Sequence, residues 1–473
     1  MKVVEVVIQS GKLVFSLCLS PDKIRLTGYP KHFHIVLRTI QREHNYGPDP
    51  MKITIVGGGY VGLVTGACFA DIGHDVSIIE VDTAKVGMIN EKRAPIFEPG
   101  LENILIRTAG KNLRADLSYD PVSISDLTFI CVGTPPKEDG SMNLTYIESA
   151  SRSIGHALQK ATGYHVVVVK STVPPGTTET VVRPAVLTSA DKTEDDIGFA
   201  MNPEFLREGR AIEDFRQPDR IVIGSNRPGA GDRVAEVYRS FSAPVVRTDL
   251  MAAEMIKYTS NAFLATKISF SNEIGNICKE LGIDVYEVMK GVGLDQRIGP
   301  QFLNAGAGFG GSCFPKDVSS LAVLAGRAGV DPRILRAVLE VNEYQPHRLV
   351  ALLEKKAGNL SGKRIAVLGL AFKDNTDDVR DSRAIPVIRE LQKKGARVVA
   401  FDPMAGPNMQ KIFPAIEYTG SAEDALVGAD GCLVMTEWPE FSRIDKEFDL
   451  MAHKIVIEGR RILSWNGAEG ICW

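Results

Sequence analysis

Short apolar runs rich in valine and isoleucine alternate with helix-like amphipathic stretches from residue 51 to about residue 248. Alternation of this kind is typical of β-α-β units. The pattern therefore predicts a doubly wound, mostly parallel sheet over residues 51–248. The expected strands occupy residues 52–57, 73–80, 127–132, 165–170, 197–201 and 220–224.

The pattern changes near Asp249, where apolar residues recur at helical spacing with few helix-breaking residues between them. This spacing predicts a long connecting helix. More helix is expected up to about Leu353, interrupted by a glycine-rich loop between Gly291 and Gly311. We therefore assign residues 249–355 to a central helical domain.

The last third of the chain repeats the first in outline. Apolar runs at residues 363–369, 395–402 and 431–435 follow one another in the same order as the first three expected strands. They predict a second Rossmann-like domain over residues 356–473, without the glycine signature described below. The fold expected for the chain is α/β, with two doubly wound domains joined by a long central helix.

Residues 1–50 differ from the rest, with seven Lys and Arg against four Asp and Glu and no clear hydrophobic period. Because Met51 opens the first expected strand directly, we expect residues 1–50 to be an extension that is either not native or dispensable and disordered. A secretory signal is not indicated, since Gln9, Ser10 and Lys12 break the apolar stretches.

Composition excludes several classes of protein. Hydrophobic content of 44% and charged content of 24% are ordinary for a soluble globular chain of 473 residues. A net charge of −3 argues against nucleic acid as the main partner, and no apolar run is long enough to suggest a membrane span. The seven cysteines form no C-x-x-C pairs, so neither a disulfide framework nor a metal site is indicated and a reducing cytoplasm fits best.

A dinucleotide-binding signature opens the first domain. Gly57, Gly59 and Gly62 form G-x-G-x-x-G between a strand-like and a helix-like run, where the glycines allow a tight turn, the approach of a pyrophosphate and close helix packing. The next expected strand ends at Glu80, which would bond the ribose hydroxyls and repel a 2′-phosphate, favouring NAD over NADP. Asp82 is the competing candidate, and a glycine-rich turn without a ligand is the alternative.

A second glycine-rich segment, residues 308–317, holds Cys313 with Lys316 and Asp317 directly after it. Small neighbours would let a substrate carbon approach the sulfur, and a thiolate is a strong nucleophile. A small buried thiol in a tight turn is the alternative. The dinucleotide signature elsewhere in the chain favours the nucleophile.

Three polar residues of the long expected helix share one face. Glu254, Lys257 and Asn261 lie at positions i, i+3 and i+7, so they point either into a cleft or along a solvated stripe. An ammonium and an amide are donors suited to an oxygen on which negative charge develops. No role is assigned to Glu254.

From Met51 to about Leu463 the chain resembles the UDP-glucose/GDP-mannose dehydrogenase family. The resemblance implies NAD-dependent, four-electron oxidation of a nucleotide sugar's primary alcohol to a carboxylate, and a central dimerisation region. Because Phe314 follows the cysteine where related branches more often carry Leu or Ile, we favour UDP-glucose as substrate and UDP-glucuronate as product. Matching motifs, beside those above, are residues 131–135, 171–177, 202–209 and 369–373.

The resemblance also implies catalytic roles. Cys313 adds to the aldehyde as a thiohemiacetal and then carries a thioester, while Lys257 and Asn261 hold the reacting oxygen and Asp317 lies near the departing proton. Glu204 is the implied base for thioester hydrolysis, with a helix-start carboxylate as its alternative. Thr134 is implied to help hold the water, with a structural hydroxyl as its alternative.

Binding residues are implied in the same way. Solvated surface charge is the alternative for the basic residues among them. The implied cofactor contacts are Gly57, Gly59, Tyr60, Val61, Gly62, Glu80, Lys85, Thr134, Glu208 and Lys316. The implied substrate contacts are Phe205, Leu206, Lys257, Asn261, Arg297, Phe302, Leu303, Asn304, Gly310, Lys373 and Arg460, with Arg297 reaching the substrate of a second subunit.

Three other interpretations stay open. Within the family, GDP-mannose or a UDP-N-acetyl-hexosamine are alternative substrates. A simpler hydroxyacid dehydrogenase would need neither Cys313 nor a second nucleotide domain. A non-catalytic nucleotide-sugar-binding protein is disfavoured because all the implied catalytic residues are present. A homodimer or a larger homo-oligomer is expected.

Overall fold

The computed structural model describes residues 3–7, 15–18, 36–38 and 50–473. The first three ranges contain strands β1 (Val3–Val7), β2 (Phe15–Cys18) and β3 (Val36–Arg38), which pair antiparallel in the order β2-β1-β3. Residues 1–49 and residues 50–473 are separate compact units. The expectation of a dispensable or disordered extension falls mostly outside the described residues.

The second unit begins with an eight-stranded sheet of order β11-β10-β9-β8-β7-β4-β5-β6. Every neighbouring pair is parallel except β9 with β10, so the predicted mostly parallel sheet is confirmed. The strands are β4 (Lys52–Val56), β5 (Asp75–Ile79), β6 (Leu113–Asp116), β7 (Leu127–Ile130), β8 (His165–Val169), β9 (Ile197–Met201), β10 (Ile221–Ser225) and β11 (Val245–Thr248).

Helices cover both faces of this sheet, which explains the continuous apolar runs of its central strands. In β8, Val166 and Val168 face one core and Val167 and Val169 the other. The first core is closed by α1 (Tyr60–Asp71), α2 (Thr83–Asn90), α3 (Leu101–Thr108), α6 (Ala211–Arg216) and α7 (Pro228–Val237). The second is closed by α4 (Thr145–Leu158) and α5 (Arg183–Ala190).

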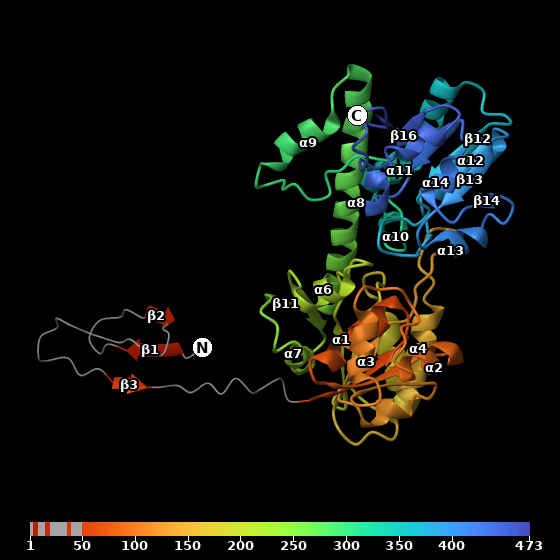
Figure 1. The fold of residues 1–473 in the computed structure, drawn as a ribbon. Helices are drawn as coiled ribbons and strands as arrows, with labels where there is room; N and C mark the ends of the chain where they lie inside the picture. The colour runs from red at the N-terminus through yellow and green to blue at the C-terminus, as the bar shows by residue number, and fades with distance from the viewer. Residues whose placement is uncertain (1–2, 8–14, 19–35, 39–49) are drawn as a thin grey trace, which may run out of the picture. The chain divides into compact units, whose positions relative to one another are not determined.

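A single long helix, α8 (Leu250–Leu281), follows the last strand (Figure 1). The Asp249 carboxylate accepts a hydrogen bond from the Ala252 N–H at 2.8 Å and caps its start, while Gly282, with φ of 70°, ends it. Helices α9 (Val285–Gly293), α10 (Phe314–Arg327) and α11 (Arg333–Ala357) follow. Helices α8, α10 and α11 share a small apolar core with the loop residue Phe309.

The final domain contains a six-stranded, all-parallel sheet of order β14-β13-β12-β15-β16-β17. This is the order of the first six strands of the earlier sheet, so the predicted fold of two Rossmann-like domains joined by a long helix is confirmed. The strands are β12 (Arg364–Leu368), β13 (Arg397–Phe401), β14 (Glu417–Tyr418), β15 (Gly431–Val434), β16 (Val456–Glu458) and β17 (Glu469–Gly470). The helices are α12 (Ala384–Lys393), α13 (Gly406–Gln410) and α14 (Ala422–Leu426).

Across the part of the chain that the structure describes, no helix combines the length and apolar character needed to cross a membrane.

Candidate active site

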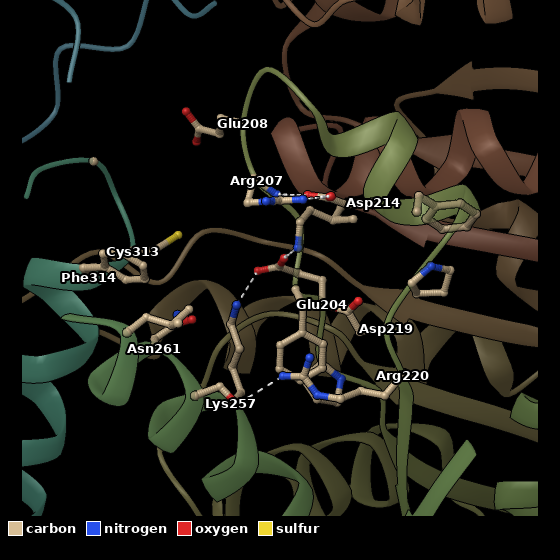
Figure 2. A pocket seen from close by; sticks show the side chains of 18 of the residues that line it. Glu204, Arg207, Glu208, Asp214, Asp219, Arg220, Lys257, Asn261, Cys313 and Phe314 are labelled. Atoms are coloured by element: carbon tan, nitrogen blue, oxygen red, sulfur yellow. Dashed lines mark hydrogen bonds and ion pairs between the residues drawn. The ribbon is translucent and has the colours of Figure 1, made fainter. Parts of the chain in front are cut away.

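The polar face of α8 points into the protein. Lys257 is 2% exposed and its Nζ lies 2.9 Å from a carboxylate oxygen of Glu204 (Figure 2). The Asn261 amide donates to the Asp317 carboxylate at 2.6 Å. Glu254 on the same face is fully buried. The solvated stripe considered from spacing alone is therefore excluded.

Glu204 stands in an irregular segment that follows β9, and no helix begins there. Its second carboxylate oxygen accepts a hydrogen bond from the Leu206 N–H at 2.5 Å. Burial raises the pKa of Glu204, but the Lys257 ammonium and the Leu206 N–H outweigh burial and hold the pKa below its usual range. The helix-start interpretation is wrong, and Glu204 is a buried carboxylate facing a lysine.

Cys313 lies directly before α10, with its sulfur pointing into the cavity that Glu204 and Lys257 also line (Figure 2). Burial raises the pKa of the thiol, and the Lys257 ammonium opposes this shift. The thiol is therefore protonated at neutral pH, and a base is needed to make it nucleophilic.

The glycines beside Cys313 serve a packing purpose that the sequence interpretation missed. A Cβ on Gly310 would lie 2.3 Å from the Asp381 carbonyl oxygen, and one on Gly311 would lie 2.8 Å from the Phe372 ring. Gly311 also has φ of 83°, and its N–H donates to the Arg380 carbonyl at 2.9 Å. The glycines let the second Rossmann domain pack directly against the thiol loop.

A cavity of about 910 Å³ joins these groups, and we call it the Cys313 cavity. Its walls come from the segment after β9, from α8, from the loop before α10 and from residues 372–373 of the second Rossmann domain. Of the predicted site residues it brings together Glu204, Phe205, Leu206, Glu208, Lys257, Asn261, Phe302, Gly310, Cys313 and Lys373.

The glycine turn of the first domain has the geometry that a pyrophosphate needs. Gly57 has φ of 104°, and a Cβ on Gly62 would lie 1.9 Å from the Gly57 carbonyl oxygen. A Cβ on Gly59 would meet no atom within 4 Å, so this turn faces open space. Glu80 stands beside the turn, with one oxygen 3.0 Å from the Cβ position of Gly58. These residues fit a dinucleotide.

The structure also separates the two candidate acids. The Asp82 carboxylate accepts from the N–H groups of Ala84 and Lys85 and caps α2. Glu80 accepts from the N–H groups of Val81 and Asp82 through one oxygen, which leaves its other oxygen toward the glycine turn. Glu80 is thus the acid that faces the turn.

Matches to three domains of one family decide where the chain belongs. The chain matches the UDP-glucose/GDP-mannose dehydrogenase family over its NAD binding domain at residues 51–242, its central domain at residues 251–344 and its UDP binding domain at residues 366–464. This chain belongs to the UDP-glucose/GDP-mannose dehydrogenase family. The resemblance noted from the motifs is confirmed.

Several relatives in this family have assigned activities. A UDP-glucose 6-dehydrogenase of Haloferax volcanii is 48% identical over 420 residues, covering 88% of this chain and 97% of the relative. One from Bacillus subtilis is 44% identical over 87% of this chain and 90% of the relative. The solved UDP-glucose dehydrogenase of Pyrobaculum islandicum is 43% identical with a TM-score of 0.87, covering 90% of this chain and 99% of that structure.

Asp317 lies in the first turn of α10, shortly after Cys313. It is fully buried and accepts hydrogen bonds from Asn261 and, at 2.5 Å, from the neighbouring Lys316.

Thr134 donates to the Thr172 carbonyl at 3.0 Å, so its hydroxyl proton has a structural partner and only its lone pairs are free to accept. Lys85 lies on α2, a short way after Glu80 in the sequence, and its side chain is half-buried.

Of the three basic residues other than Lys257 that are predicted to contact the substrate, one lines the Cys313 cavity and two do not. Lys373 lines the Cys313 cavity. Arg460 donates to the Gly308 carbonyl and pairs with Glu437 at 3.3 Å, so it holds the loop that contains Leu303 and Asn304. Arg297 does not line the cavity: its side chain is 88% exposed and pairs with Asp295 at 2.6 Å.

Four residues of the site were missed in the sequence. The Arg220 guanidinium stacks 3.8 Å above the Phe205 ring in the Cys313 cavity, and its place at the start of an expected strand concealed it. Glu98 bonds the hydroxyl of Tyr60 and accepts from the Gly209 N–H at 2.7 Å, joining the glycine turn to the segment after Glu208. Arg380 and Lys170 are described below.

Glu208 lies where the two Rossmann domains meet. Arg380 of the second domain approaches the Glu208 carboxylate at 3.2 Å and also pairs with Asp378 at 2.6 Å. Burial and the nearby Asp378 carboxylate raise the pKa of Glu208 to about 7. Residues separated by about 170 positions therefore form one charged contact, which no local pattern indicates.

Glu254, which had no assigned role, anchors α8. Its carboxylate accepts from the N–H of Gly176 at 2.5 Å, from the N–H of Thr178 at 2.8 Å and from the Thr178 hydroxyl at 2.6 Å. It thus ties the helix that carries Lys257 and Asn261 to the first Rossmann domain.

Proposed function

We propose that this chain oxidises UDP-glucose to UDP-glucuronate, with NAD as the oxidant and Cys313 as the covalent nucleophile. Membership of the family makes the chain an NAD-dependent dehydrogenase. Its relatives at 40–48% identity carry the name UDP-glucose 6-dehydrogenase, whereas a UDP-D-ManNAc dehydrogenase structure from Pyrococcus horikoshii is 28% identical. The observation that carries the proposal is the single cavity shared by Cys313, Lys257, Glu204 and Asn261.

We propose that the three domains, residues 51–248, 249–355 and 356–473, have different roles. The first range would hold NAD at Gly57, Gly59 and Gly62, with Glu80 placed to bond the ribose hydroxyls. When bound, NAD would supply the hydride acceptor for each of the two oxidations. The second range supplies the thiol loop and α8, and the third closes over the substrate's nucleotide.

In the first oxidation the primary alcohol loses a hydride and a proton and becomes an aldehyde. Lys257 and Asn261 donate hydrogen bonds to the reacting oxygen, because these buried side chains point into the Cys313 cavity. Asp317, held by Asn261 and Lys316, lies at the far end of this chain of hydrogen bonds and receives the departing proton through Lys257 or a water.

In the second oxidation the Cys313 sulfur adds to the aldehyde carbon. The thiol proton is transferred, through Lys257 or a water, to the aldehyde oxygen, which becomes the hydroxyl of a thiohemiacetal. Loss of a second hydride and of the hydroxyl proton from that adduct gives a thioester. Lys257 lowers the pKa of the thiol against the effect of burial, so its charge favours the addition.

Hydrolysis of the thioester releases the carboxylate. Glu204 takes a proton from the attacking water, and the sulfur leaves and is reprotonated. Glu204 suits this role because its pKa lies below the usual range, so it is ionised and able to accept a proton at neutral pH. Thr134 offers lone pairs to the same water.

An exposed apolar stripe supports a homodimer built on the central domain. Phe263, Phe270 and Ile277 recur every seven residues along α8 and are more than half exposed. A second copy of the same helix would cover such a stripe. Arg297, which is exposed and lies outside the cavity of its own chain, would then reach the partner's substrate. A reducing cytoplasm is proposed because Cys313 must stay a free thiol.

The test is the amount of NADH formed from a limiting quantity of UDP-glucose. Two NADH per UDP-glucose, with loss of turnover in Cys313→Ser, is the expected result. Cys278→Ser removes a buried thiol outside the cavity and is the matched control. One NADH per sugar would contradict the thioester route, and turnover only with GDP-mannose or a UDP-N-acetyl-hexosamine would replace the substrate.

A further inference from the structure

Lys170 is a buried cation in the wall of the Cys313 cavity that the proposed mechanism leaves unused. It follows β8 directly and is 4% exposed. Its ammonium donates to the Asn202 side-chain oxygen at 3.0 Å, to the Tyr238 hydroxyl at 3.3 Å and to the Asn202 carbonyl at 3.4 Å. Three acceptors satisfy the three N–H bonds of the charged form.

All three of these acceptors are neutral. Within residues 50–473 no carboxylate lies within ion-pair distance of the Lys170 ammonium. A buried charge without a counter-ion is costly, and its field extends farther than that of a paired charge. Glu204 is two residues from Asn202 and lines the same cavity, so its carboxylate is placed to receive that field.

Lys257 cannot supply this charge throughout the reaction. In the present structure it pairs with Glu204 at 2.9 Å, but the proposed chemistry turns the same ammonium toward the reacting oxygen. Glu204 would then be a buried carboxylate that has lost its partner just before it must act as a base. The Lys170 ammonium, fixed by Asn202 and Tyr238, does not take part in those changes.

We propose that Lys170 is a positioning residue that holds residues 202–204 in place and keeps Glu204 ionised for hydrolysis of the thioester. This inference rests on the proposed function of Glu204. Lys170 acts through another group and does not touch the reacting atoms.

The charges around the two residues agree with this assignment. Burial raises the pKa of Glu204, and Lys257, the Leu206 N–H and Lys170 lower it by more. Burial lowers the pKa of Lys170 to about 8, while Cys131 and Glu204 raise it and Lys257 lowers it. Lys170 thus keeps its charge below about pH 8, where hydrolysis needs an ionised Glu204.

The experiment compares Lys170→Met with wild type by pH profile and by pre-steady-state NADH formation. Methionine keeps the volume of the stem and removes the charge, while the Tyr238 hydroxyl still donates to Asn202 at 2.6 Å. Because Lys170 and Glu204 line one cavity, the low-pH limb of the profile, where the hydrolytic rate falls, should move up by on the order of one pH unit. At pH values on this low-pH limb, the variant should show a burst of two NADH per active site followed by slow turnover, because both NADH form before the thioester is hydrolysed.

Two further lysine variants test whether the effect comes from the charge of Lys170. Lys170→Arg restores a charge and should return the low-pH limb toward the wild-type position. Lys192→Met removes the charge of a lysine that donates to the Ala161 carbonyl, outside the Cys313 cavity, and should leave the limb in place. If Lys170→Met does not fold, Lys170→Gln, which keeps donors for Asn202, takes its place.

The proposal is overturned if a folded, uncharged variant keeps the wild-type low-pH limb, or if its rate falls equally at every pH. The proposed function is tested separately by the wild-type yield of two NADH per UDP-glucose. If wild type formed two NADH per UDP-glucose and the low-pH limb of the Lys170 variant did not move, only the role of Lys170 would be rejected and the proposed function would stand.

Discussion

The two Rossmann-like domains share a topology but use the same turn in opposite ways. Both sheets order their first six strands identically, and Gly57 and Gly369 both follow the first strand with positive φ. The Gly57 N–H donates to the Ile79 carbonyl and the Gly369 N–H to the Phe401 carbonyl, each at 2.8 Å. Up to this point the backbones correspond.

The difference lies in the acid that ends the second strand. Glu80 bonds the N–H groups of the two residues that follow it and leaves the first turn open. Asp402 reaches into the second turn, where it accepts from the N–H of Leu370 at 2.7 Å and of Ala371 at 3.0 Å. The N–H groups that a dinucleotide-binding turn offers to a pyrophosphate are therefore already satisfied.

Other side chains complete the closure of the second turn. The Trp438 indole donates to the same Asp402 oxygen at 3.0 Å, and Thr436 lies 2.5 Å from the Cβ position of Gly369. Arg460 of this domain instead faces the central loops, where it donates to the Gly308 carbonyl. One fold thus supplies an open dinucleotide turn in the first domain and a closed turn in the second.

The largest effect is expected when the second turn is opened. Asp402→Ala leaves buried N–H groups and the Trp438 indole without an acceptor, so the free energy of unfolding should fall by about 3–5 kcal/mol. NADH affinity at the first domain should not change. Thermal unfolding and NADH titration by fluorescence measure the two quantities, and a loss of NADH affinity in the folded variant would break the comparison.

A smaller effect is expected at the first turn. Glu80→Ala should weaken NADH binding by about tenfold, because Glu80 is the proposed partner of the ribose hydroxyls, and should reduce the preference for NADH over NADPH. Stability should hardly change, since the residue bonds only two neighbouring N–H groups. Equal NADH affinity in variant and wild type, measured by titration, would show that Glu80 is not the ribose acid. Asp82→Ala, which removes the α2 cap, is the matched control.

The smallest effect is expected where the two domains touch. The pKa of Glu208 is raised from 4.5 to about 7, so the folded state binds more protons than the unfolded state in that window. Stability contributed by this group is therefore lost as the pH rises through about 7. Glu208→Gln should remove this dependence, which is at most about 1 kcal/mol after solvent screening, and should flatten the dependence of the melting temperature on pH between about pH 5 and pH 8.

An Asp378→Asn variant should flatten the same profile, because the Asp378 carboxylate is one cause of the raised pKa. If the melting temperature of both variants depended on pH as in wild type, protonation of Glu208 at this contact would not be the cause of the dependence.

Local patterns were enough for the order of elements. The apolar runs of β8 and β12 predicted strands, and the spacing after Asp249 predicted α8, because burial on sheet faces or along a helix is written in short-range periodicity. The motif glycines and Cys313 could also be found from their neighbours in the sequence. What could not be found were partners far along the chain, as for Glu254 and Thr178 or Lys170 and Asn202.

The sequence by itself determined the α/β fold, the dinucleotide turn and the presence of a thiol beside a lysine and an aspartate. Only the tertiary structure decided that Glu204 pairs with Lys257, that Gly310 and Gly311 make room for the second domain, and that Asp402 fills its own turn. The reason is physical. Periodicity and turn chemistry act between near neighbours, whereas burial, ion pairing and pKa shifts depend on which distant segments the fold brings into contact.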